Sequence, residues 1–392
     1  MKKSRVARFC TWTAILWIYH NPGPRLQSQC VWNRQQLSAS YRDGGEFNCF
    51  NVSLPNITIY ATGGTIAGSA SSADQTTGYQ AGSLGVQALI DAVPQLCNVA
   101  NVRGVQVFNI DSINMNSSML LLLSQGIQDD LDSPYTQGAV VTHGTDTLEE
   151  SAFFLDLTIQ SDKPIVVTGS MRPATAISAD GPMNLLSSVT VAASDNARGR
   201  GVMIVLNDRI GSARFMSKSN ANQLDAFQSA DGGFLGGFVN TQPIFYDPPS
   251  RPPGHHHFDV RRVRRWRGED VKLPQVDVLY AHQDLNVGLF QAAIDLGAKG
   301  IVLAGFGAGY WTDSGSVEIR RALQDTDIPV IVSRRTGWGF ANSNGVEGGI
   351  GAGLLNPQKA RIQLQLALGT ELETEAIRTI FEHRRAMFGT RS

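Results

Sequence analysis

Apolar, strand-like runs alternate with helix-like segments along most of this chain of 392 residues. This alternation is typical of a parallel sheet covered by helices. The predicted strands of the first part are Ile57 to Ala61, Val105 to Ile110, Ala139 to Thr142, Ile165 to Thr168 and Gly201 to Leu206. Apolar residues three and four positions apart predict helices at Gly85 to Val93, Met119 to Leu131 and Leu148 to Leu157. We therefore expect an α/β fold with a mostly parallel sheet flanked by helices.

A proline-rich break at residues 240–274 divides the chain. At 392 residues and 42% hydrophobic composition, the chain is long enough for two domains with separate cores. We predict a larger N-terminal domain at 54–239, a linker at 240–274 and a smaller C-terminal α/β domain at 275–392. The elements expected in the smaller domain are strands at 276–280, 300–304 and 329–333, and helices at 288–297, 317–324 and near 373–387.

Residues 1–53 form a tail that begins like a secretory signal. The basic head Met1 to Arg8 precedes the apolar run Phe9 to Tyr19, which is the usual outline of a signal peptide. The run is shorter than the ~20 residues that cross a bilayer, so no stable membrane span is expected. We predict a secreted or periplasmic protein. The alternative is an N-terminal extension on a cytoplasmic protein.

The four cysteines are too few for a disulfide scaffold. Cys10 would leave with a signal peptide, and Cys30 and Cys49 flank a polar stretch. These two could close a loop and leave Cys97 alone, although the sequence does not prove that pairing. The chain also has glycosylation sequons at Asn51, Asn56 and Asn116. They would make it a glycoprotein only if a eukaryote secretes it.

Charge and composition exclude several function classes. The net charge of −1 implies no general attraction to nucleic acid or to a membrane surface. The basic run Arg261 to Arg267 could hold a polyanion, but arginines pairing with nearby carboxylates in a linker are the preferred interpretation. Three consecutive histidines, His255 to His257, lack the facing geometry of metal ligands. We expect a solvated linker there and no metal.

A glycine turn follows the first predicted strand and leaves a threonine hydroxyl at its end. The turn reads Thr62-Gly63-Gly64-Thr65. Ligands of open α/β sheets bind outside the carboxyl ends of the strands, so Thr65 is the first candidate nucleophile. A dinucleotide site would need Gly-x-Gly-x-x-Gly, whereas Gly63 and Gly64 are adjacent. Nucleotide binding is therefore not expected.

A second polar turn, Gly144-Thr145-Asp146-Thr147, follows the third predicted strand. Thr145 and Asp146 should lie at the same end of the sheet as Thr65, although the turn alone could be an ordinary helix cap. A threonine nucleophile needs a base, and a lysine can serve. Lys218 lies beyond the fifth strand, but an isolated lysine is more often a solvated surface group.

These motifs resemble those of the type II bacterial L-asparaginases and their glutaminase-asparaginase relatives, from about Leu54 to Phe388. The two most specific are Ala61 to Gly68 and Thr142 to Thr147. The resemblance implies hydrolysis of L-asparagine to L-aspartate and ammonia through a threonine-linked acyl-enzyme, with weaker hydrolysis of L-glutamine. It also implies that no cofactor is needed, and that four chains assemble from two pairs with sites at the subunit interface.

The resemblance also assigns roles to residues. Thr65 matches the nucleophile and Tyr79 the tyrosine of a mobile flap, while Thr145, Asp146 and Lys218 match a hydrogen-bonded relay. Ser112 matches the serine that holds the substrate α-carboxylate, and Asp146 also faces its α-amino group. The remaining expected substrate contacts are Gly64, Gly144 and Asp284, the last at the position lent by a neighbouring subunit.

The chain departs from the family's pattern at three positions. Asp284 stands where relatives often have Asn or Ser. Ile113 stands where many relatives have Gln or Glu, so one polar contact to the substrate amine should be missing. The family's second-subunit glutamate has no clear counterpart, and Glu347 is only a guess. The last two departures favour the alternative of a catalytically weak extracellular amino-acid-binding protein. The complete set of hydroxyl, carboxylate and amine groups disfavours it.

Overall fold

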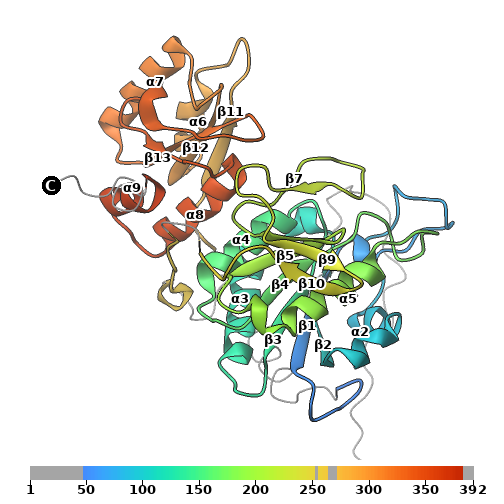
Figure 1. The fold of residues 1–392 in the computed structure, drawn as a ribbon. Helices are drawn as coiled ribbons and strands as arrows, with labels where there is room; N and C mark the ends of the chain where they lie inside the picture. Colours follow the sequence, from blue (N-terminus) through green and yellow to red (C-terminus); the bar gives the residue numbers. More distant parts are fainter. Residues whose placement is uncertain (1–46, 252–254, 264–271, 383–392) are drawn as a thin grey trace, which may run out of the picture.

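A computed structural model describes residues 47–251, 255–263 and 272–382. The N-terminal signal-like segment, Cys10, Cys30, residues 264–267 of the basic run and the end of the predicted C-terminal helix lie outside these ranges. The described residues form a larger and a smaller α/β domain, as the sequence predicts (Figure 1). No helix within the described ranges is both long and apolar enough to cross a membrane.

The larger domain is built on an eight-stranded sheet in the order β10-β9-β6-β5-β4-β3-β1-β2. Its strands are β1 (Asn56–Gly63), β2 (Asn101–Ile110), β3 (Gly138–Thr142), β4 (Ile165–Thr168), β5 (Val202–Leu206), β6 (Arg209–Ser212), β9 (Gly236–Val239) and β10 (Gln242–Phe245). The first five are mutually parallel and the last three antiparallel. Strand order reverses at β1, whose neighbours are β2 and β3, and such a reversal opens a crevice at the carboxyl ends of the strands.

Helices cover both faces of this sheet because its strands are apolar on both sides. One core joins α3 (Ser117–Leu131) and α4 (Leu148–Thr158) to the face that includes Tyr60 and Val141. The other joins α2 (Val86–Asp91) and α5 (Gly181–Ala192) to the face that includes Ile59 and Val140. Neighbouring residues of one strand thus enter different cores, as the two-residue period of a strand requires.

The predicted linker is partly wrong, because regular structure continues past residue 239. Strand β10 lies at residues 242–245 and forms the edge of the large sheet. Asn240 and Thr241 join it to β9 with φ values of 50° and 64°. Two consecutive positive φ angles define the two-residue turn that suits a twisted hairpin. Pro243 is tolerated in β10 because an edge strand leaves one side of its backbone unpaired.

The histidine run is also not a solvated linker. His255 and His257 are half-buried and direct their Nε2 atoms at carbonyls near the end of α4, those of Asp156 at 3.0 Å and Thr158 at 3.1 Å. Of the basic run, Arg261 pairs with Asp259 at 2.8 Å, which agrees with the preferred interpretation for that residue. Among the described residues, no cluster of His, Cys, Asp and Glu could hold a metal ion.

The smaller domain contains a parallel four-stranded sheet in the order β11-β12-β13-β14. Its elements are β11 (Val276–Tyr280), α6 (Leu289–Asp295), β12 (Gly300–Gly305), α7 (Asp313–Asp325), β13 (Val330–Arg334), β14 (Ile350–Gly351), α8 (Pro357–Gly369) and α9 (Thr374–Glu382). Helices α6 and α7 pack on one face. Helix α8 packs on the other and shares a core with Phe153 and Phe154 of α4. This shared core joins the two domains (Figure 1).

A disulfide bond joins Cys49 to Cys97, with Cα atoms 5.7 Å apart. This pairing corrects the expectation that Cys30 and Cys49 might close a loop and leave Cys97 alone. Cys97 lies in a short 3₁₀ helix (Pro94–Asn98) just before β2. The segment after Cys49 runs beside the start of β2, where the Asn51 N–H donates to the Asn101 side chain at 2.7 Å. The bond therefore ties the start of the described chain to the edge of the large sheet.

We predict that the double substitution Cys49→Ser/Cys97→Ser destabilises the protein without changing its site. The bond closes a sequence separation of 48 residues, for which the chain-entropy relation gives a stabilisation of about 4 kcal/mol. Urea unfolding of the variant and the wild type measures the difference. Adding a reductant should lower the stability of the wild type only. Equal unfolding midpoints for the two proteins would contradict the prediction.

Candidate active site

The first glycine turn brings a threonine hydroxyl to the carboxyl end of β1. Gly63 and Gly64 have φ values of 103° and 79°, which are accessible to glycine but rarely to other residues. The turn is fixed by a hydrogen bond from the Gly64 N–H to the Ile110 carbonyl at the end of β2, at 2.9 Å. A short 3₁₀ helix (Thr65–Ala67) follows, and Thr65 is only 8% exposed.

Thr65 and Tyr79 face each other. Their hydroxyl oxygens are 2.7 Å apart, within hydrogen-bond distance. Burial raises the pKa of Tyr79 above its ordinary value, the bond to Thr65 opposes that shift, and the nearby charges of Asp146 and Asp111 raise the pKa further. The phenol is therefore protonated at neutral pH and can act as a hydrogen-bond donor towards Thr65.

The segment that carries Tyr79 is a loop that docks on the residues following β4. Its ends meet through an antiparallel bridge between Ser69 and Gln80. The Ala70 N–H donates to the Thr175 hydroxyl at 2.9 Å, and the Ala174 N–H donates to the Gly68 carbonyl at 3.0 Å. Figure 1 shows this loop projecting from the larger domain beyond β1. The sequence gives no role to Ala174 and Thr175, because they are distant in the chain from the loop that they contact.

Two side chains of the second turn, Thr145 and Asp146, form a hydrogen-bonded group with Lys218. Lys218 lies in the short strand β7 (Ser217–Lys218), and its Nζ atom is 3.0 Å from Thr145 Oγ1 and 2.6 Å from Asp146 Oδ1. Thr145 is 5% exposed, whereas the Asp146 side chain is 56% exposed. The predicted lysine is thus not a solvated surface group. Lys218 lies between the buried hydroxyl of Thr145 and the exposed carboxylate of Asp146, which can still contact a ligand.

Close backbone packing places the two turns side by side. A Cβ atom added at Gly64 would lie 2.3 Å from the Gly144 Cα atom, so the two backbones touch. A Cβ added at Gly144 would lie 2.6 Å from the hydroxyl of Ser112, which follows β2 and is 2% exposed. The three loops after β1, β2 and β3 therefore meet at the carboxyl ends of these strands. Thr65, Thr145 and Ser112 lie in these three loops.

His143, directly before the second turn, is fully buried. Burial lowers its pKa to about 4, so the imidazole is neutral at pH 7. Its Nδ1 atom is 2.8 Å from the Gly144 carbonyl. His143 therefore supports the turn. Because its side chain is buried, it cannot contact a ligand.

Two positions raised by the resemblance lie in the smaller domain, and a third adjoins Ser112. Asp284 follows β11 in the smaller domain with φ 54°, whereas Thr65, Thr145 and Lys218 lie in the larger domain. Glu347 is exposed and pairs with Arg320 at 2.8 Å. Ile113 directly follows Ser112 and is 65% exposed. The missing polar contact to the substrate amine stays a prediction.

Comparison with known proteins identifies the family. The family model described as "Asparaginase, N-terminal" matches residues 56–251, and that described as "Glutaminase/Asparaginase C-terminal domain" matches residues 275–381. The chain belongs to the asparaginase family. Together the two matches cover both domains, and they include the two glycine turns and Lys218.

Several similar proteins bear asparaginase names. The chain is 51% identical to "Probable L-asparaginase 3" of Schizosaccharomyces pombe, over 86% of this chain and 91% of that protein. It is 40% identical to "L-asparaginase 2" of Bacillus subtilis, over 97% and 99% of the two chains. The crystal structure of a probable cytoplasmic L-asparaginase from Campylobacter jejuni has a TM-score of 0.78 and 41% identity, covering 84% of this chain and 99% of that one.

Proposed function

We propose that this asparaginase-family enzyme hydrolyses the side-chain amide of L-asparagine to give L-aspartate and ammonia. The observation that carries the proposal is the contact between the Gly64 and Gly144 backbones, which sets the hydroxyls of Thr65 and Thr145 in adjoining turns. The names of relatives 40–51% identical over most of the chain support the same substrate.

In the proposed first step, Thr65 Oγ1 attacks the amide carbon of asparagine. As the C–O bond forms, the Thr65 proton passes to a neighbouring basic group, from which it later reaches the leaving nitrogen, and preorganised donors stabilise the oxyanion. The C–N bond then breaks, the nitrogen takes up a proton and leaves as ammonia, and an ester links the aspartyl group to Thr65. Tyr79 supports this step by its hydrogen bond to the Thr65 hydroxyl.

The second step consumes water. The Thr145, Lys218 and Asp146 group is arranged to accept and pass a proton, because Lys218 contacts both other side chains. Water attacks the ester carbon, the Thr65 oxygen recovers a proton, and aspartate leaves. Ser112 is proposed to hold the α-carboxylate of the substrate, and the exposed carboxylate of Asp146 its α-amino group.

A catalytically weak binding protein is the alternative, and Ile113 is the observation that favours it. A single measurement separates the two functions, namely ammonia release from L-asparagine by the purified protein across substrate concentrations. The same assay with L-glutamine determines whether the weaker second activity exists. Saturable binding of asparagine without ammonia release would reject the enzymatic proposal.

We also propose that four chains assemble from two pairs and that Asp284 of one chain completes the site of its neighbour. Asp284 follows β11 in the smaller domain whereas Thr65 follows β1 in the larger one, which is consistent with such a role. Secretion or a periplasmic location is proposed because a disulfide such as Cys49–Cys97 persists in oxidising compartments. One relative is named periplasmic and another cytoplasmic, so the names of relatives do not decide the compartment.

The exposed side chain of Ile113 leads to a prediction about substrate affinity. We expect Ile113→Gln to lower the KM for L-asparagine by about tenfold, because one hydrogen bond to the charged ammonium group of the substrate contributes about 1.5 kcal/mol. Steady-state ammonia release measures KM and kcat. The control is Ile113→Leu, which keeps an apolar side chain and should leave KM unchanged. An unaltered KM in the glutamine variant would show that Ile113 lies away from the amine.

A further inference from the structure

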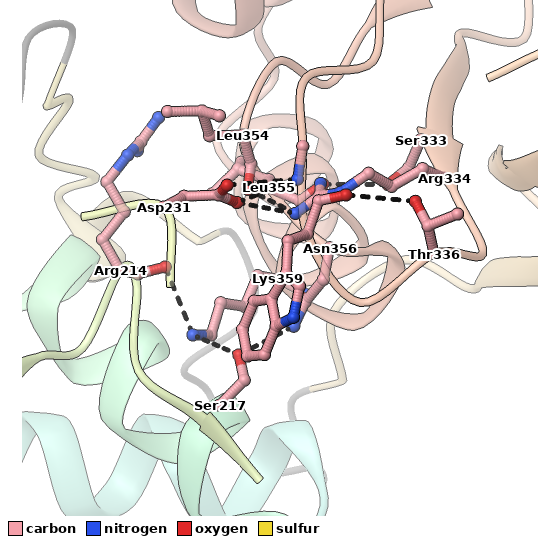
Figure 2. Close-up of polar contacts among 12 residues, drawn as sticks. Arg214, Ser217, Asp231, Ser333, Arg334, Thr336, Leu354, Leu355, Asn356 and Lys359 are labelled. Atoms are coloured by element: carbon pink, nitrogen blue, oxygen red, sulfur yellow. Dashed lines mark hydrogen bonds and ion pairs between the residues drawn. The ribbon is translucent and has the colours of Figure 1, made fainter. Parts of the chain in front are cut away.

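Lys359, in helix α8 of the smaller domain, is buried and reaches across the domain boundary. Its side chain is 1% exposed. Nζ donates to the carbonyl of Met216 at 2.6 Å, to the carbonyl of Arg214 at 3.2 Å and to the hydroxyl of Ser217 at 3.3 Å. Figure 2 shows Lys359 directed at this segment of the larger domain. All three acceptors lie within four residues of Lys218.

Glu149, in helix α4, links the same group to Lys218 itself. Its Oε1 atom accepts the backbone N–H of Lys218 at 3.3 Å, and its Oε2 atom lies 3.5 Å from Lys359 Nζ. Asn356, at the start of α8, donates to Glu149 Oε2 at 2.9 Å and to the Ser217 hydroxyl at 3.1 Å. The carboxylate is 5% exposed, so its charge is held by these partners and not by water.

The strand that carries Lys218 has little support from the large sheet. β7 consists of two residues, and within the part of the chain that the structure describes it pairs only with the two-residue strand β8 (Phe227–Gln228), in a separate sheet. An isolated pair of strands of this size is marginal without packing from elsewhere. The contacts from Lys359, Glu149 and Asn356 supply a fixed anchor for its backbone.

We propose that Lys359 is a positioning residue for the reaction, and that through it the smaller domain holds β7 so that the Lys218 amine reaches Thr145 and Asp146. The inference rests on the proposed function. Lys218 Nζ makes contacts of 3.0 and 2.6 Å, and a displacement of the strand by about 1 Å would break at least one of them. The lysine donates to all of its acceptors at once only while α8 remains docked.

The test is Lys359→Met, which keeps the length of the side chain and removes its charge and donors. We expect kcat for L-asparagine to fall at least about tenfold while KM stays nearly unchanged, because substrate contacts are kept and the proton-transfer geometry is lost. The matched control is Arg361→Met. Arg361 lies on the same helix and pairs across the same boundary with Glu150 at 3.7 Å, and its other recorded contact is the Val276 carbonyl. The Arg361→Met variant should keep the wild-type kcat.

Both variants are assayed well below their melting temperatures, so that lost stability does not count as lost activity. An unchanged kcat in Lys359→Met, or an equal loss in Arg361→Met, would overturn the inference. If Lys359→Met does not fold, Ser217→Ala removes one acceptor with little change in volume. Its kcat should fall about fivefold, as expected for one hydrogen bond, and an unchanged value would likewise overturn the inference.

A fourth variant, Lys218→Met, separates this inference from the proposed function. If Lys218→Met is inactive and Lys359→Met is fully active, only the positioning role fails. If Lys218→Met retains full activity, the relay itself fails, and the positioning role fails with it.

Discussion

Thr65→Val is expected to abolish ammonia release from L-asparagine while leaving the fold intact. Valine matches threonine in shape, so the buried site remains filled, but the attacking oxygen is lost. The expected fall in kcat is about 10³-fold or more, as for the loss of other catalytic nucleophiles. Ammonia assays of the purified variant measure this fall, and circular dichroism with thermal melting tests whether the fold is kept.

Thr65→Ser provides the matched comparison because it keeps the hydroxyl and removes only a methyl group. Part of the activity should remain in this variant. The Tyr79 hydroxyl should also keep its partner in the serine variant and lose it in the valine variant. Substantial turnover by Thr65→Val in preparations free of wild-type protein would reject the nucleophilic role.

The second large effect is expected for Lys218→Met. General acid–base groups typically contribute between about 10² and 10⁴ in rate, and a loss of kcat in that range is expected with little change in KM. Thr145 would lose its contact at 3.0 Å, whereas Asp146 is 56% exposed on its side chain and would be solvated in the variant. The fold should therefore survive. Steady-state kinetics with asparagine gives both constants.

Lys299→Met is a suitable control for this loss of a lysine. Lys299 is exposed between α6 and β12 in the smaller domain. Its replacement should leave both constants unchanged. Wild-type kcat in Lys218→Met would mean that the Thr145 hydroxyl needs no amine beside it, and the relay would have to be abandoned.

The parts of the site that could be predicted are those specified by short stretches of sequence. A strand, a glycine turn and a hydroxyl lie within a few residues of each other at Thr65, and again at Thr145. The direction of parallel strands then places both turns at one end of the sheet. The two domains and the strands before the first hairpin follow from the same local patterns. Lys218 required the family resemblance, because one lysine in a polar segment has no distinctive pattern.

The parts that could not be predicted depend on contacts between residues distant in the chain. The partner of Cys49 is 48 residues away, and the cysteine spacing alone allowed another pairing. The sequence does not predict strand β10, because the prolines that follow it dominate the local composition. Lys359, like Lys218, is a single lysine with no distinctive local pattern. Its burial depends on the docking of α8 against α4, which neither helix specifies alone.

The contact between the Gly64 and Gly144 backbones also limits which residues of the site can be changed by design. Any side chain at either position would push the two turns apart, so a library that varies them would consist mainly of inactive proteins. Ile113 is 65% exposed and so has room for larger and more polar side chains. Selection for a longer amide substrate should therefore enrich changes on the Ser112 side of the crevice and preserve the glycines unchanged.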